Sequence, residues 1–152
     1  MIWAAVAGCS ADEPAATGAG AGFTGEVVRV ADGDTVRVRI DGGREERVRY
    51  IGVDTPEPTA GECFADEATA ANARLVEGRA VRLVPGEERR DRYGRLLAYV
   101  YSGDVLVNAA LVREGYAQPL PVAPNVRFED RFARLARDAR RAGRGLWASC
   151  SS

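Results

Sequence analysis

The segment TVRVRI, residues 35–40, alternates polar and apolar side chains along its whole length. Such alternation is typical of a strand that buries one face, here the face that carries Val36 and Val38. Valine-rich residues 23–31 precede this segment and residues 46–51 follow it, each across a short glycine-containing turn. Because short turns join neighbouring antiparallel strands, the three segments predict a three-stranded meander.

The rest of the chain adds two strands and three helices to this meander. The strands are predicted at residues 80–84 and 95–101, with a charged loop after the first of them at residues 85–88. Apolar side chains at helical spacing predict helices over residues 62–77, 107–114 and 129–142. Three prolines argue against regular structure between residues 118 and 125. This order indicates an α+β fold, a small barrel with helices packed on it.

The composition limits the chemistry that the chain can perform. Its 152 residues suffice for one domain with its own core, and all 21 basic residues are arginine. The absence of histidine excludes Ser-His-Asp and Cys-His catalysis and histidine-ligated zinc sites. Catalysis would therefore use carboxylates, arginines, tyrosines or a metal. With a net charge of −1, binding of a polyanion requires a local positive site.

The first 22 residues are expected to lie outside the folded domain, which we place at residues 23–152. The sequence VAGC at residues 6–9 resembles a bacterial lipobox, in which Cys9 would carry lipid after a truncated export signal. Residues 10–22 are rich in Ala, Gly, Thr, Ser and Pro, as a flexible tether would be. The alternative is an accidental cysteine in a tail. We expect an extracellular or cell-surface protein, with membrane contact only through lipid on Cys9.

The two remaining cysteines suggest a disulfide. If Cys9 carries lipid, Cys63 and Cys150 form an even pair in an exported protein, where disulfides persist. Their bridge would pin the C-terminal tail beside the loop that follows Glu57.

Carboxylates and arginines are concentrated in three short motifs, DGDT at residues 32–35, RYIGVDTPE at 49–57 and DRYGR at 91–95. Pro56 fixes its own φ and pushes Thr55 into an extended conformation, so the backbone of the second motif is stiff. Each motif alone is also compatible with an ordinary turn or a surface ion pair. Together they supply acids for a hard metal, a spare acid and two arginines, which suggests hydrolysis of a phosphate ester.

With NAALVREG at residues 108–115 and GLW at 145–147, these motifs resemble the micrococcal nuclease (thermonuclease) family over about residues 23–147. The resemblance implies a five-stranded OB-fold β-barrel with three α-helices. It also implies a calcium-dependent nuclease that hydrolyses phosphodiester bonds of single- and double-stranded DNA and RNA with little sequence specificity and leaves 3′-phosphates. We expect the protein to be a monomer.

The resemblance assigns the metal ligands. Asp34 and Asp54 would bind Ca²⁺ together with the carbonyl oxygen of Thr55, and Asp32 would support this site from outside the ligand set. Calcium accepts six to eight oxygen ligands in loose geometry, so water and a phosphate oxygen would complete the shell.

The resemblance also assigns the catalytic residues. Glu57 lies where the family has its general base, and Arg49 and Arg95 would clamp the phosphate and stabilise the charge of the transition state. Tyr93 would contact the terminal phosphate or the nucleotide.

Two departures from the family pattern affect substrate binding. Residues 118–122 contain no tyrosine to stack on a base, and the loop before the first helix is shortened to PTAGE, residues 58–62. The alternatives are a non-catalytic nucleic-acid or protein-binding domain on the same barrel, and a lipid-tethered structural module. The complete set of acids and arginines favours the enzyme.

Overall fold

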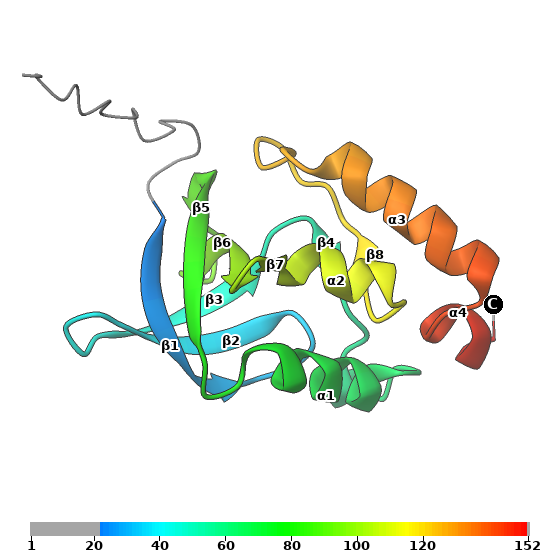
Figure 1. Ribbon diagram of the computed structural model, residues 1–152, viewed down its shortest axis with the longest axis horizontal. Helices are drawn as coiled ribbons and strands as arrows, with labels where there is room; N and C mark the ends of the chain where they lie inside the picture. The colour runs from blue at the N-terminus through cyan, green and yellow to red at the C-terminus, as the bar shows by residue number, and fades with distance from the viewer. Residues whose placement is uncertain (1–21, 152) are drawn as a thin grey trace, which may run out of the picture.

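A computed structural model describes residues 22–151, and its centre is a closed five-stranded barrel (Figure 1). The strands are β1 (Phe23–Val30), β2 (Thr35–Ile40), β3 (Glu45–Tyr50), β5 (Ala80–Arg90) and β6 (Leu96–Ser102). They follow the order β3-β2-β1-β5-β6, and the parallel pairing of β3 with β6 closes the barrel. This architecture confirms the predicted OB-fold. The predicted export signal, Cys9 and most of the tether lie outside the described residues.

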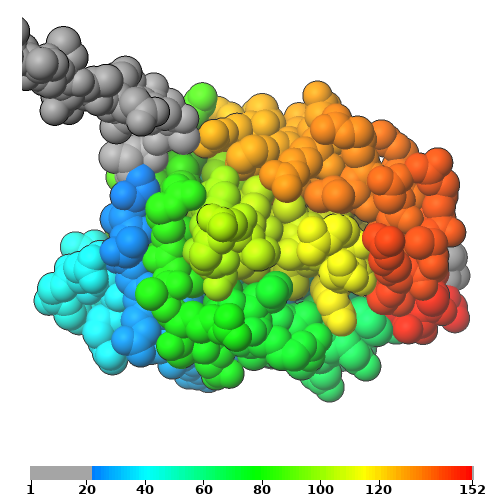
Figure 2. Space-filling model, viewed as in Figure 1, coloured from blue at the N-terminus to red at the C-terminus, as the bar shows by residue number. Residues whose placement is uncertain are grey.

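The helices cover one side of the barrel. They are α1 (Ala65–Val76), α2 (Val107–Arg113), α3 (Glu129–Ala142) and a short α4 (Leu146–Ser149), with a 3₁₀ turn η1 (Pro58–Ala60). The first three are the predicted helices, and α4 is an addition. Figure 2 shows α1, α2 and α3 as neighbouring bands of one continuous surface beside the strands. The six residues from Val107 to Val112 are all buried, which places α2 between the barrel and α3.

The barrel core is built mainly from valine, as the alternation of β2 predicts. Val36 and Val38 point inward with exposed fractions of 1% and 0%, and Val27 of β1 and Val48 of β3 are fully buried beside them. Short β-branched side chains suit a small barrel because they fill its narrow interior on a pleated surface.

The structure corrects two predictions. The predicted loop at residues 85–88 is part of β5, because Asn125 replaces the missing ladder partners: its side chain accepts a hydrogen bond from Glu88 N at 3.0 Å and donates one to Glu88 O at 2.9 Å. The proline-rich segment also contains a two-residue strand, β8 (Gln118–Pro119), which pairs with β4 (Val53–Asp54). A third short strand, β7 (Val105–Leu106), pairs antiparallel with the end of β6.

Two buried asparagines connect the helices to the chain segments that carry the motifs. Asn72 of α1 accepts a hydrogen bond from the Tyr50 hydroxyl at 2.7 Å and donates one to the carbonyl of Asp32 at 2.9 Å. Asn108 of α2 accepts one from Val100 N and donates one to the carbonyl of Ile51, both at 2.9 Å. The backbone near the start of each of these two motifs is therefore fixed from a helix.

Replacement of Asn108 with alanine should destabilise the fold. It leaves a backbone N–H and a backbone carbonyl buried without partners, which should lower the free energy of unfolding by about 2–4 kcal/mol. Equilibrium unfolding in denaturant measures the loss, with Val105→Ala, at a 42% exposed position, as the control expected to change little. A loss below about 1 kcal/mol for Asn108→Ala would contradict this role.

Candidate active site

Arg49 is held at the end of β3 by the turn that follows it. Its Nη1 donates to the carbonyls of Tyr50 at 2.8 Å and Val53 at 2.7 Å, across the reversal at Gly52, whose φ is +76°. Its Nη2 lies 3.3 Å from Asp34 Oδ2 and 3.2 Å from Asp54 Oδ1. The guanidinium is thus fixed by two carbonyls and two carboxylates, with only 14% of the side chain exposed.

Asp34 joins the first acidic motif to the second. Its side chain is 1% exposed, and Oδ2 accepts hydrogen bonds from Thr55 N at 2.9 Å and Thr55 Oγ1 at 3.1 Å. Oδ1 accepts one from Thr35 Oγ1 at 3.1 Å. The close approach of the Asp34 turn to Thr55 requires glycine at position 33, because a Cβ there would lie 2.5 Å from Thr55 Oγ1.

Three of the four acids form one cluster, and the fourth lies apart from it. Carboxylate oxygens of Asp32, Asp34 and Glu57 all lie within 4.8 Å of one another. Asp54 lies outside this group, with 53% of its side chain exposed and its carboxylate on Arg49. The structure therefore brings Asp34 and Asp54 to the same guanidinium, and it places Asp32, expected only in support, among the clustered acids.

The pKa values of three acids are raised above their ordinary values. Burial, followed by the charge of Asp34, raises the pKa of Asp32 to about 6, although a hydrogen bond from Asp34 N opposes this. Burial and the charges of Asp34 and Asp54 raise the pKa of Glu57. Burial also raises the pKa of Asp54, against the lowering effect of Arg49. A hard cation at this cluster would relieve the repulsion between the ionised forms.

Arg95 is positioned by the hairpin between β5 and β6. Asp91 Oδ1 accepts hydrogen bonds from the backbone N–H of Tyr93 at 2.9 Å and of Arg95 at 3.0 Å, while Oδ2 accepts one from Arg95 Nε at 2.7 Å. The Arg95 guanidinium also lies 5.4 Å from the centre of the Tyr93 ring, which is the most exposed aromatic residue of this hairpin. Asp91 thus orients the second arginine.

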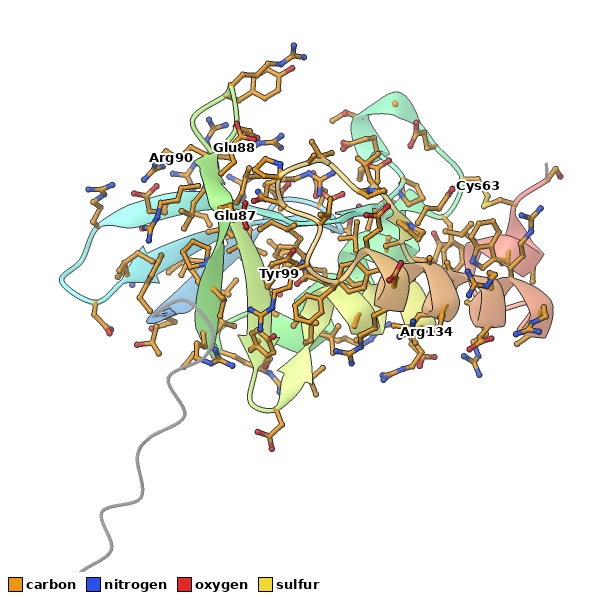
Figure 3. The ribbon with its side chains drawn as sticks, turned by 90° about the horizontal axis from the view of Figure 1, so that it is seen from above. Cys63, Glu87, Glu88, Arg90, Tyr99 and Arg134 are labelled. Carbon is orange, nitrogen blue, oxygen red and sulfur yellow. A yellow bond between two sulfur atoms is a disulfide. The ribbon has the colours of Figure 1, made fainter. Side chains whose placement is uncertain are left out.

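Arg49 and Arg95 line the same pocket, which has a volume of about 320 Å³. Its apolar wall comes from Leu97, Leu120 and Val122. A larger pocket, of about 520 Å³, is lined by other residues, including Glu87 and Tyr99, which are labelled in Figure 3. We take the smaller pocket as the candidate site because the acidic cluster adjoins it through Arg49.

Sequence reasoning missed two supporting residues. Asn72 holds the Asp32 carbonyl, and Asp91 orients Arg95. The only signal for Asn72 was a polar residue beside the apolar stripe of a predicted helix. Asp91 was visible as part of DRYGR, but its bonds to the hairpin backbone could not be read from the motif.

The fold is an OB-fold barrel, and its candidate site combines a pocket lined by two arginines with a cluster of carboxylates beside it. The chain belongs to the staphylococcal nuclease homologue family, whose model matches residues 47–149. It is similar to the thermonuclease of Staphylococcus hyicus, 35% identical over 130 residues that cover 83% of this chain and 76% of that protein. It is also similar to endonuclease YncB of Bacillus subtilis (strain 168). The two are 36% identical over 126 residues, which cover 79% of this chain and 59% of that protein. An uncharacterized endonuclease of Escherichia coli O157:H7 is 36% identical over 125 residues, which cover 82% of this chain and 76% of that protein.

Replacement of Asp32 with asparagine should stabilise the metal-free protein at neutral pH. The raised pKa means that the folded chain favours protonated Asp32 more than the unfolded chain does. The stability that this protonated form contributes is fully present below pH 3.8 and is lost as the pH rises toward about 6. The asparagine Oδ1 can still accept the bond from Asp34 N. Unfolding midpoints in chelator should therefore be higher for Asp32→Asn above pH 6, and the difference should vanish below pH 3.8. A less stable variant at neutral pH would contradict the raised pKa.

Proposed function

We propose that this protein is a calcium-dependent nuclease that hydrolyses phosphodiester bonds of DNA and RNA, single- or double-stranded, with little sequence specificity. The observation that carries this proposal is that Arg49 and Arg95 line one pocket beside clustered carboxylates. The nuclease names of the relatives support the same chemistry.

The two arginines would bind the scissile phosphate from two sides. Each is already oriented by protein contacts, Arg49 by backbone carbonyls and Arg95 by Asp91. A guanidinium presents several N–H donors in one plane, so it can hold two phosphate oxygens at once. Preorganised donors also stabilise the negative charge that grows in the transition state, which is worth a few kcal/mol each. Tyr93, exposed on the hairpin next to Arg95, would contact the terminal phosphate or nucleotide.

The acids fit a calcium ion because they offer only carboxylate oxygens, the donors that calcium prefers. Asp34, Asp54 and the Thr55 carbonyl oxygen would hold the ion, with Asp32 beside them. When bound, calcium would neutralise phosphate charge and orient the reacting groups.

Glu57 would act as the general base. It projects from an exposed turn beside Asp34, and its raised pKa makes it a better proton acceptor than an ordinary glutamate. It would take a proton from the attacking water as the new P–O bond forms. The bond from phosphorus to the 5′ oxygen would break, and the leaving oxygen would take a proton from solvent water, which leaves a 3′-phosphate and a 5′-hydroxyl.

We also propose that the domain at residues 23–152 acts as a monomer outside the cell or at its surface, with any membrane contact made through lipid on Cys9. The disulfide between Cys63 and Cys150 supports an exported protein, because such bonds persist in oxidising compartments. Within the described residues, no helix is long and apolar enough to cross a membrane.

Calcium dependence is the first test. Purified protein should degrade single-stranded DNA and RNA when calcium is present, and excess chelator should stop the reaction until calcium is restored. Gel or fluorescence assays measure the rate, and end-labelling measures the 3′-phosphate. Tight DNA binding without cleavage under every metal condition would indicate the binding domain instead.

Substitutions separate the roles of the base and the clamp. Glu57→Gln should lower kcat by roughly 10²–10⁴ because no base takes the proton from water. Arg95→Gly should lower kcat by roughly 10²–10³ through loss of charge stabilisation. Circular dichroism checks that both variants fold, and Arg134→Gln, at an exposed position on α3, is the control for loss of one arginine charge. Full activity of either site variant would remove the role assigned to that residue.

A further inference from the structure

The segment that carries Glu57 is not fixed by the core. In the described chain, none of residues 56–64 is buried, whereas Thr55 before them and Ala65 after them are. A buried residue therefore flanks the segment at each end, Thr55 through its hydrogen bonds to Asp34 and Ala65 at the start of α1. The position of the Glu57 carboxylate depends on the polar and covalent contacts between those ends.

Glu62 makes the first of these contacts. Its Oε2 accepts a hydrogen bond from Glu57 N at 2.7 Å, and its own N–H donates to the Glu57 carbonyl at 3.2 Å. Ala60 N also donates to that carbonyl at 3.2 Å. These bonds close the chain around η1 into one turn, with Glu57 at its start and Glu62 at its end.

The next residue fastens this turn to the C-terminus. Cys63 is bonded to Cys150, and it lies in Figure 3 between the loop that leads into α1 and the C-terminal segment. Cys150, the other half of the bridge, is held by backbone hydrogen bonds of the C-terminal segment. Leu146 is 6% exposed and donates from its N–H to the Gly115 carbonyl at 2.8 Å, and Cys150 N donates to the Leu146 carbonyl at 3.0 Å.

Phe64, the residue after Cys63, attaches the same stretch of backbone to the rest of the fold through its ring. Its φ of +71° lies in the left-handed region, which a residue other than glycine retains only when its surroundings hold it there. Its ring stacks on Tyr116, with ring centres 5.5 Å apart and planes inclined by 17°. The bridge at Cys63 and this stack hold the backbone together, directly after the turn that contains Glu57.

We propose that Glu62 and the Cys63–Cys150 disulfide position Glu57 for the reaction, so that the enzyme is fully active only when the two cysteines are oxidised. This inference rests on the proposed function. Glu57 is the group that meets the reacting water, and Glu62, Cys63 and Cys150 act through it. Cys63 is exposed, so a dithiol reductant can reach the bridge, give it two electrons and leave two thiols as the reductant itself becomes a disulfide.

The Cys63→Ala/Cys150→Ala double variant tests the bridge. We expect kcat to fall roughly 10- to 100-fold with KM for DNA nearly unchanged, because displacement of a catalytic group by about 1 Å costs rate while Arg49 and Arg95 remain in place. Treatment with dithiothreitol should reproduce this loss in the wild-type protein and leave the double variant unchanged. Leu83→Ala, in the fully buried barrel core, is the control for general destabilisation and should keep kcat at temperatures where it remains folded.

Hydrogen exchange on the calcium-free protein provides a readout that does not depend on activity. The amides of residue 57 and residues 59–63 should exchange faster in the double variant, whereas those of β2 and β3 should be unaffected. Unchanged kcat or unchanged exchange in this segment would overturn the proposal. A wild-type protein without nuclease activity would refute the proposed function alone, since the exchange experiment would still report on the segment.

Glu62 is tested by a pair of substitutions. Glu62→Ala removes the acceptor for Glu57 N, whereas Glu62→Gln keeps an acceptor oxygen and removes only the charge. We expect a several-fold loss of kcat and faster amide exchange at residue 57 and residues 59–62 for alanine, with glutamine close to wild type. Equal losses in both variants would show that the charge of Glu62 matters, and would overturn its assignment as a positioning residue.

Discussion

The buried carboxylate of Asp34 is the constraint on which the site depends. A buried charge is stable only when it is hydrogen-bonded and paired, and Asp34 obtains both from the second motif. Thr55 donates two hydrogen bonds to it, and Arg49 supplies the opposite charge. Two turns that are 21 residues apart in sequence are thereby fixed against each other. Loss of the contact between Asp34 and Thr55 would separate Asp34 from Arg49 and would leave a buried carboxylate without its partners.

The barrel and helices extend this local constraint. Asn72 and Asn108 hold the backbone at Asp32 and Ile51 from two different helices, so the acidic turns are braced from outside the sheet. The Asp91 hairpin places Arg95 in the pocket that Arg49 also lines. The charges are therefore positioned before a substrate arrives, as electrostatic catalysis requires. The turn that carries Glu57 is the exception, since it is fastened by hydrogen bonds and a disulfide.

Local patterns predicted the barrel well, because alternation in β2 and helical spacing in α1 and α3 report burial directly. They failed where a distant residue supplies the partner: β5 continues because Asn125 bonds Glu88, and β8 exists because β4 lies beside it. The motifs likewise contain the acids and arginines that the structure brings to the candidate site. Their grouping could not be predicted, because the placement of Asp32 with Glu57, and of Asp54 on Arg49, depends on how two loops meet.

The most direct measurement of the central claim is a crystal structure with calcium and a short oligonucleotide that resists cleavage. The account predicts one ion in contact with the Asp34 carboxylate and one phosphate between Arg49 and Arg95. An ion bound away from Asp34, or a phosphate that touches neither arginine, would contradict it.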